Sequence, residues 1–316
     1  MNVDFENIKI EEDGGLEVPG KTKQVGIIGE MRGGFVDNVR ATKVEVYTYQ
    51  SGGGIIGQIT GLTNTITRCS LINPLFSMRQ DATRDELVST FESLDPNDSH
   101  IYLIHASSKY AGGIIGNVQM NGDQVFLNLY VSNCLCIANI GDEQDSGGCV
   151  CGIVGRIKSG PEYVVDVRNN VYKGTLIAYG NYNGGIIGGF ETGGAEATIL
   201  NNISIAVFRY RGTYLDALAQ KLSSTNLYEY AHKNSSPIVG RVSVSEDYGY
   251  YYAVKNIGTW RENYSNYIGS LSLVFDLYDE ENKKEFVLTK ALLKTYDFDF
   301  DNIWDLNEET QEFSLK

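Results

Sequence analysis

Gly54-Ile55-Ile56-Gly57 is the segment on which the fold of this chain depends, because the sequence keeps returning to it. The same Gly-Ile-Ile-Gly tetrapeptide stands at residues 26–29, 113–116 and 185–188, and variants stand at residues 152–155, 237–240 and 267–269. The shortest spacings between the last glycines of successive copies are 28 and 29 residues. Such a period is typical of repeat architectures, in which each unit is too small to bury its own apolar face and stacks on its neighbours. The longer spacings then indicate units with insertions.

A second signature follows the copies: Val or Ile, any residue, then Asn. Arg68 takes the place of the asparagine in one unit, and the asparagines of the others are Asn38, Asn133, Asn169, Asn201 and Asn256. Asn tolerates the left-handed backbone region that a sharp corner requires, so we expect these residues to stack along one edge. Two roles stay open for their side chains, a hydrogen-bonded ladder between units and plain turn chemistry, and the two are compatible.

The segments between the two signatures predict strands. Residues 42–49 alternate cleanly between polar and apolar positions, and residues 124–131 consist mostly of β-forming residues. The glycines beside each Ile pair allow sharp turns and a close approach of adjacent units. Together these patterns predict an all-β fold, namely a parallel β-solenoid (β-helix) of about six to seven coils with short helical insertions and a C-terminal cap.

The predicted organisation is an N-terminal cap at residues 1–24, a solenoid at residues 25–270 with insertions near residues 72–110 and 208–236, and an acidic C-terminal cap at residues 271–316. In the first insertion, Thr83-Arg84-Asp85-Glu86 is a capping box that precedes apolar residues at helical spacing, which predicts an amphipathic helix. A shorter helix is predicted over residues 213–222.

The C-terminal segment from residue 271 holds 12 acidic and 5 basic side chains, which is half of the net charge of −14. Aromatic residues alternate there with acids, and we expect the aromatic face to seal the final coil around Ile268. The acids would face water and oppose the end-to-end self-association that open strand edges invite. The aromatic residues are Tyr296, Phe298, Phe300 and Trp304.

The same segment also suggests a calcium loop of the EF-hand kind, as an alternative to the capping strand. Its metal ligands would be Asp297, Asp299, Asp301 and Glu308. The turn glycine that such a loop requires is replaced by Asn302, and no flanking helix pair is visible, so the capping strand is the favoured interpretation.

Charge and segment composition exclude several classes of function. A pI near 4.7 disfavours nucleic-acid binding, because an acidic surface repels phosphate backbones. No apolar run is long enough to span a bilayer, so no membrane insertion is predicted. Residues 1–6 have neither a basic nor an apolar segment of the kind that opens a secretory signal. The sequence contains no phosphate loop and no nucleophile elbow, and no cofactor is predicted.

Five cysteines on a chain of this length do not indicate a disulfide scaffold. The pairs Cys134/Cys136 and Cys149/Cys151 would each place both thiols on one face of a strand, since residues two apart in a strand point the same way. Cys69 falls in the same repeat column as Cys134, which favours stacked core cysteines. A disulfide or a four-thiolate zinc site is the alternative.

A cluster of tyrosines is the remaining candidate for a binding site. It could bind sugar or protein, or it could be a strand whose edge is protected by aromatic side chains, and it consists of Tyr248, Tyr250, Tyr251 and Tyr252. The histidines are interpreted as surface or loop residues, because no nucleophile motif accompanies them; they are His100, His105 and His232.

The Gly-Ile-Ile-Gly step followed by Ile/Val-x-Asn turns resembles the GLUG-motif repeat, which is found in large bacterial surface proteins, including adhesins. The resemblance covers residues 24–271, and residues 296–305 resemble the segment that commonly closes such arrays. It implies a β-helical stalk or binding region with a cell-surface or extracellular location. The repeat itself carries no catalytic residues, so the resemblance assigns none to this chain.

We therefore expect a non-catalytic module for surface adhesion, binding or structural scaffolding, with a protein or glycan surface as its partner. The alternative is a carbohydrate-active parallel β-helix enzyme, either a polysaccharide lyase or a glycoside hydrolase. Such enzymes need acids gathered on one exposed sheet face, and no column of Asp or Glu recurs across the units. An intracellular structural protein is a third hypothesis.

Overall fold

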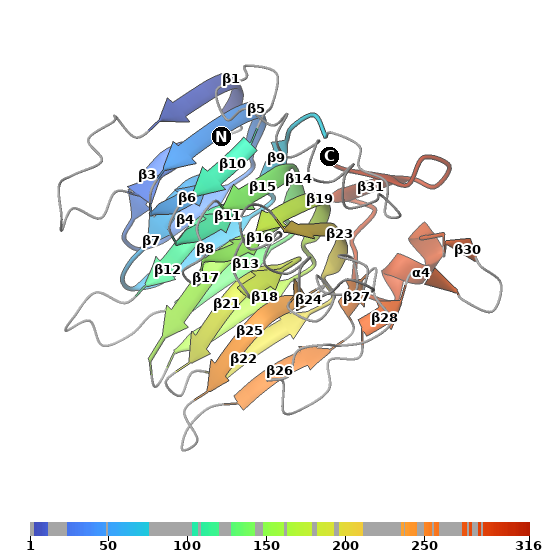
Figure 1. Ribbon diagram of the computed structural model, residues 1–316. Coiled ribbons are helices and arrows are strands. Elements are labelled where there is room, and N and C mark those ends of the chain that lie inside the picture. The colour runs from blue at the N-terminus through green and yellow to red at the C-terminus, as the bar shows by residue number, and fades with distance from the viewer. Residues whose placement is uncertain are drawn as a thin grey trace, which may run out of the picture.

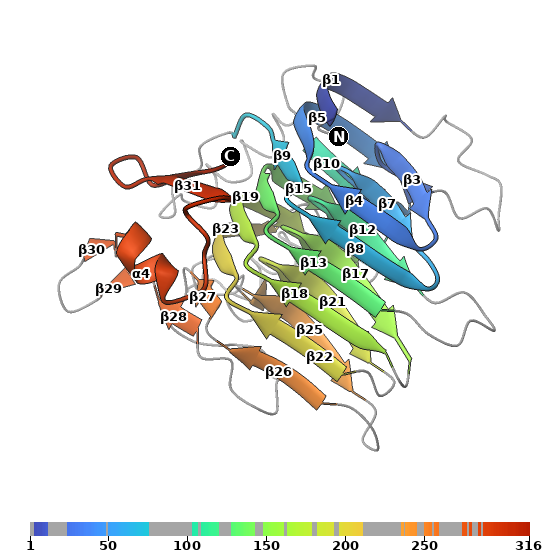
Figure 2. The ribbon, with the colours of Figure 1, turned by 180° about the vertical axis from the view of Figure 1, so that it is seen from behind.

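The structure, a computed structural model of the 316-residue chain, is all-β with parallel sheets (Figures 1 and 2). It describes residues 3–11, 24–48, 50–75, 103–106, 109–119, 128–142, 148–160, 163–178, 182–192, 196–210, 235–236, 238–244, 250–254, 256–258, 274–276, 278–279, 284–285 and 287–316. The predicted strands at residues 42–49 and 124–131 overlap described strands. The two predicted helices, near residues 83–94 and 213–222, lie outside the described residues, as do Ile268 and its Tyr-Ile-Gly copy.

Four sheets of parallel strands make up the body of the fold. Sheet A contains β1 (Val3–Glu11), β5 (Val39–Thr48), β9 (Ser70–Ile72), β10 (Leu103–Ala106), β14 (Leu135–Ile137), β15 (Asn139–Asp142), β19 (Val171–Ala178), β23 (Ile203–Tyr210), β27 (Asn256–Gly258) and β28 (Val274–Asp276). Sheet B contains β2 (Gln24–Val25), β6 (Ser51–Gly53), β11 (Tyr110–Gly112), β16 (Cys149–Cys151), β20 (Tyr182–Gly184) and β24 (Ser235–Ser236).

Sheets C and D follow the same order of units. Sheet C contains β3 (Ile28–Met31), β7 (Ile56–Ile59), β12 (Ile115–Gln119), β17 (Val154–Ser159), β21 (Ile187–Thr192) and β25 (Val239–Val244). Sheet D contains β4 (Gly34–Asp37), β8 (Thr63–Thr67), β13 (Asn128–Ser132), β18 (Val164–Arg168), β22 (Glu196–Leu200) and β26 (Tyr250–Val254). Each repeat unit thus supplies a strand to every sheet, in the chain order B, C, D and A.

The Gly-Ile-Ile-Gly copies lie in register at the start of sheet C. The second apolar residue of each copy pairs with its equivalent in the next unit, in the order Ile28, Ile56, Ile115, Val154, Ile187 and Val239. The Pro-Ile-Val-Gly copy at residues 237–240 is therefore a true member of the repeat. From the second unit onward these side chains are fully buried, so the repeat forms one continuous apolar core.

Glycine is required at many positions in and beside these copies, although not at Gly29, because neighbouring backbones approach too closely for a side chain. A Cβ added to Gly152 would lie 2.1 Å from the carbonyl oxygen of Gly185 and 2.1 Å from Cγ of the buried Tyr172 ring. A Cβ added to Gly53 would lie 1.9 Å from the carbonyl oxygen of Ile56. The tight turn from sheet B to sheet C can therefore form only because glycine recurs there, as the sequence predicts.

The turn from sheet D to sheet A is a corner in the left-handed region. Its residue has a φ between 51° and 56° in five units, and these residues are Asn38, Arg68, Asn133, Asn169 and Asn201. In the first four of these the backbone amide donates to the unit that follows, as Asn169 does to the carbonyl of Leu200 at 3.1 Å. The stacking predicted for the four asparagines is therefore confirmed. The placement of Asn256 in this column is wrong: the pairing of Leu200 with Val254 and of Ile203 with Ile257 aligns Asn256 with Asn202 instead.

The hydrogen-bonded ladder lies one residue after the corner. Asn170 and Asn202 are fully buried there, and Asn170 Nδ2 donates to Asn202 Oδ1 at 3.0 Å. Asn170 Oδ1 also accepts from the amide of Cys134 at 2.9 Å, and Cys134 occupies this same column in the preceding unit. The column thus joins successive units through side chains, whereas the corner residues Asn133, Asn169 and Asn201 bind a different segment.

That segment is the C-terminal clasp, residues 287–316, which contains α4 (Lys290–Lys294), β31 (Trp304–Asn307) and β32 (Glu312–Leu315). The short hairpin of β29 (Tyr278–Asp279) and β30 (Lys284–Glu285) precedes it. The clasp lies along the flank of sheet A (Figures 1 and 2). Its buried aromatic residues pack on apolar side chains that stand two residues after the corner, namely Leu135, Val171, Ile203 and Ile257.

The clasp differs from the predicted capping strand in its backbone. Its described contacts are with the flank of several units, and the predicted seal around Ile268 lies outside the described residues. Residues 296–302 form turns and not a strand, because Asp297 is left-handed with a φ of 58° and Asp299 accepts the amides of Asp301 and Asn302. The predicted burial of Phe298, Phe300 and Trp304 is confirmed, since a turn can also bury alternate residues.

Candidate functional site

The outer face of sheet D is the best-defined candidate surface in the described part of the chain. In β8, Asn64 and Ile66 are fully buried, while Thr63, Thr65 and Thr67 point outward. The same alternation recurs in β13 and β18, because successive residues of a strand face opposite sides. Parallel pairing in register then arranges the outward residues in columns that run along the stack.

Two of these columns carry most of the chemistry. The central column consists of Phe35, Thr65, Tyr130, Asp166, Thr198 and Tyr252. The column next to the corner consists of Asp37, Thr67, Ser132, Arg168, Leu200 and Val254. Strands of a sheet lie about 4.8 Å apart, so each column is a ladder with one side chain per strand.

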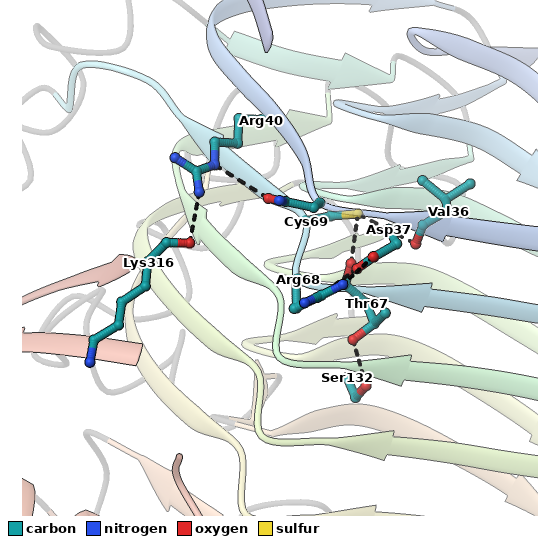
Figure 3. Close-up of polar contacts among 9 residues, drawn as sticks. Val36, Asp37, Arg40, Thr67, Arg68, Cys69, Ser132 and Lys316 are labelled. Carbon is teal, nitrogen blue, oxygen red and sulfur yellow. Dashed lines mark hydrogen bonds and ion pairs between the residues drawn. The ribbon is translucent and has the colours of Figure 1, made fainter. Parts of the chain in front are cut away.

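The face has two carboxylates with described side chains, and an arginine binds each of them. Arg68 Nε donates to Asp37 Oδ1 at 2.7 Å, and a second hydrogen bond joins the same two side chains (Figure 3). Arg168 Nε donates to Asp166 Oδ1 at 2.6 Å, again with a second contact. Hydrogen bonding to the partner carboxylate raises the pKa of both guanidinium groups. Two bidentate pairs therefore leave this part of the face locally neutral.

Arg68 stands at the corner position that asparagine occupies in the neighbouring units. The structure explains why arginine is found there: its side chain extends from the left-handed corner and binds Asp37 of the preceding unit (Figure 3). Ser132 Oγ donates to Thr67 Oγ1 at 3.1 Å, so neighbouring units are also joined across the column (Figure 3). The sequence signal was a pair of opposite charges in adjacent units, with Arg68 at the corner position and Asp37 one residue before the corner of the preceding unit.

Aromatic residues complete the face. Phe35 is 64% exposed, a high value for a large apolar side chain, and Tyr130 is half-buried. Of the predicted tyrosine cluster, Tyr250 and Tyr252 pair in the register of sheet D with Glu196 and Thr198. Tyr251 pairs with Ala197, which is a core position, and Tyr248 lies outside the described residues. The structure thus separates the cluster into two sets.

A second polar group lies on sheet C. Arg156 donates to both carboxylate oxygens of Glu191, at 3.1 and 2.6 Å, and its guanidinium carbon lies 4.7 Å from the centre of the Tyr110 ring. Burial raises the pKa of Tyr110. Asn117 Nδ2 donates to Gln58 Oε1 at 3.4 Å in the same set of outward columns. Arg156, Glu191 and Tyr110 bind one another, which indicates a structural network, whereas the buried Oδ1 of Asn117 has no hydrogen-bond partner among the described residues.

The predicted calcium ligands do not converge. Asp297 Oδ2 accepts from Asn201, Asp299 Oδ1 accepts the amides of Asp301 and Asn302, and Glu308 Oε1 accepts the amide of Lys290. Within the described residues, no three His, Cys, Asp or Glu side chains lie close enough together to hold a metal ion. The acids of the clasp serve instead to fix its turns and to anchor it to the corner asparagines.

All five thiols are buried and none of them forms a disulfide bond, as predicted for core cysteines. Burial raises the pKa of Cys134, Cys136 and Cys151, which disfavours the thiolate that metal binding and nucleophilic attack require. Of the histidines, the backbone of His105 lies in β10, while His100 and His232 lie outside the described residues.

Comparison with known proteins found no matching family model, no matching curated protein and no matching solved structure. In the described part of the chain, no helix has the length and apolar character needed to cross a membrane.

Proposed function

We propose that the stacked parallel strands form a β-solenoid related to the GLUG-motif repeats and that the chain is a non-catalytic binding module. Its contact surface is the outer face of sheet D, and its setting is a cell surface. The observation that carries this proposal is the continuity of that face, which presents aligned hydroxyl, aromatic and paired charged side chains over successive units. A rigid parallel sheet holds such side chains at fixed spacing, which lowers the entropy cost of binding an extended partner.

The same face argues for binding over catalysis. A lyase or hydrolase needs a carboxyl group that can exchange a proton with its substrate. Asp37 and Asp166 are each held by a bidentate arginine, so oxygens that would have to exchange that proton are already engaged in hydrogen bonds. The carbohydrate-active enzyme therefore remains the weaker alternative.

The experiment is a binding screen against immobilised glycans and extracellular proteins, run beside an assay for the release of reducing ends from polysaccharides. The test variant is Thr65→Arg combined with Thr198→Arg, which adds bulk and charge to the central column. The control is Gln119→Arg, a matched change on sheet C. We expect binding that the double variant loses and the control retains, without product release. Product release abolished by Asp166→Asn would establish the enzyme instead.

A further inference from the structure

Between β4 and β18, the described charges on the outer face of sheet D cancel one another, although the chain carries a net charge of −14. The two described carboxylates, Asp37 and Asp166, are matched by Arg68 and Arg168 through bidentate hydrogen bonds. A face built to hold a charged ligand would leave charge of one sign uncompensated. On this face the arginine donors bind the aspartate acceptors. Only the outward edges of these Asp–Arg pairs are then open to a ligand, and they suit neutral polar groups.

Between β4 and β18, most of the other described side chains of the face are neutral and polar or aromatic, and Val164 is aliphatic. Thr63, Thr65, Thr67 and Ser132 offer hydroxyl groups, which both donate and accept hydrogen bonds. Phe35 and Tyr130 occupy the same column as Thr65, on either side of it along the stack. Aromatic rings in such positions provide flat apolar surfaces between hydrogen-bonding groups.

We propose that this face binds a neutral, extended polysaccharide that runs along the stack, across the strands from β4 towards β18. The proposal rests on the proposed function and names its ligand class. The strand spacing of about 4.8 Å is close to the advance of one pyranose ring in an extended chain, so successive sugars meet successive strands. Sugar rings present C–H faces that stack on Phe35 and Tyr130, and their hydroxyl groups meet the threonines and the outer edges of the Asp–Arg pairs.

The charge balance distinguishes this ligand from its competitors. A polyanion such as a uronic-acid polymer would be repelled by the acidic chain, and the guanidinium donors it needs are already bound to Asp37 and Asp166. A polycation would find the same carboxylates compensated. The affinity for the neutral polysaccharide should therefore change little between low and high salt, because its binding neutralises no net charge.

The test is isothermal titration of the full chain with neutral β-1,4-linked glucan, mannan and xylan oligosaccharides, and with polygalacturonate and chitosan oligosaccharides as charged probes. Phe35→Ala and Tyr130→Ala should each weaken binding of a neutral oligosaccharide about tenfold, as expected for the loss of a stacking aromatic ring. Leu62→Ala is the matched control, because Leu62 is 63% exposed but lies outside the columns of sheet D, and it should leave the affinity unchanged.

The outcomes separate this inference from the proposed function. Preference for a charged probe, or equal affinity in Phe35→Ala and wild type, overturns the neutral-glycan inference. If no oligosaccharide binds, but the wild type binds a protein that the Thr65→Arg/Thr198→Arg variant does not bind, the neutral-glycan inference fails and the proposed binding function of the face is retained. If no partner of any kind depends on this face, both fail. Circular dichroism of each variant confirms that the strands are retained, so that loss of binding is not loss of fold.

Discussion

Asn170→Ala should be among the most destabilising single changes at the corner of the stack. Asn170 is fully buried and uses both ends of its amide. Its Oδ1 accepts from the amide of Cys134 at 2.9 Å, and its Nδ2 donates to the carbonyl of Val131 and to Asn202 Oδ1, both at 3.0 Å. The side chain therefore links its own unit to the units before and after it.

The magnitude follows from the groups that lose their partners. Alanine removes all three hydrogen bonds and leaves the Cys134 amide and the Val131 carbonyl buried without them. Each buried polar group left unsatisfied costs about 1–3 kcal/mol, so we expect a loss of about 2–5 kcal/mol in the free energy of unfolding. Asn202 Oδ1 keeps the backbone amide of Asn170 as a donor at 3.0 Å, so it adds little to this cost.

The measurement is equilibrium unfolding in urea, followed by circular dichroism of the strands. Asn128→Ala is the matched control, because Asn128 is only half-buried and accepts a single bond, from the amide of Val164 at 3.3 Å. Its loss should be no more than about 1 kcal/mol. The double change of Asn170 and Asn202 to alanine should cost less than the sum of the two single changes, because the residues share one hydrogen bond.

A loss below 1 kcal/mol for Asn170→Ala, or one equal to that of Asn128→Ala, would refute the reasoning. It would mean that water replaces the amide or that the corner relaxes without cost. Exact additivity of the Asn170 and Asn202 changes would show that the column is not a connected ladder.

Three further predictions follow from the turns, the clasp and the thiols. Gly152→Ala should abolish soluble, folded protein, because its Cβ would lie 2.1 Å from the Tyr172 ring, whereas Gly29→Ala, with its nearest atom at 3.4 Å, should be tolerated; soluble yield and melting temperature decide this. Hydrogen bonds from Asn302 lower the pKa of Asp299, so its contribution to the clasp is present above the unfolded pKa of about 3.9 and is lost as the pH falls through the lower folded value. Acid should therefore loosen the clasp below about pH 4, seen as a change in the fluorescence of the buried Trp304 in a Trp260→Phe background, and the change should be absent if Asp299 does not hold the turn. A thiol reagent should label none of the five cysteines rapidly in the native protein and all of them in urea, and fast native labelling would contradict their burial.

The sequence by itself determined the repeated elements of the fold. The Gly-Ile-Ile-Gly copies and the Val/Ile-x-Asn turns predicted strands, tight turns and left-handed corners, because these depend on local chemistry: glycine where backbones touch and Asn where φ is positive. The burial of the cysteines and of the clasp aromatics was also predictable, because small thiols and large apolar side chains are among the groups most often buried.

Only the tertiary structure decided register and docking. Asn256 matches the local corner pattern, yet strand pairing with the preceding unit places it one residue later, beside Asn202, because the register of a strand is fixed by its neighbour and not by its own sequence. The clasp lies on the flank because Asn133, Asn169 and Asn201 turn their amides toward it and a column of apolar side chains stands beside them. That surface exists only when several units are stacked, so no single stretch of sequence could reveal it.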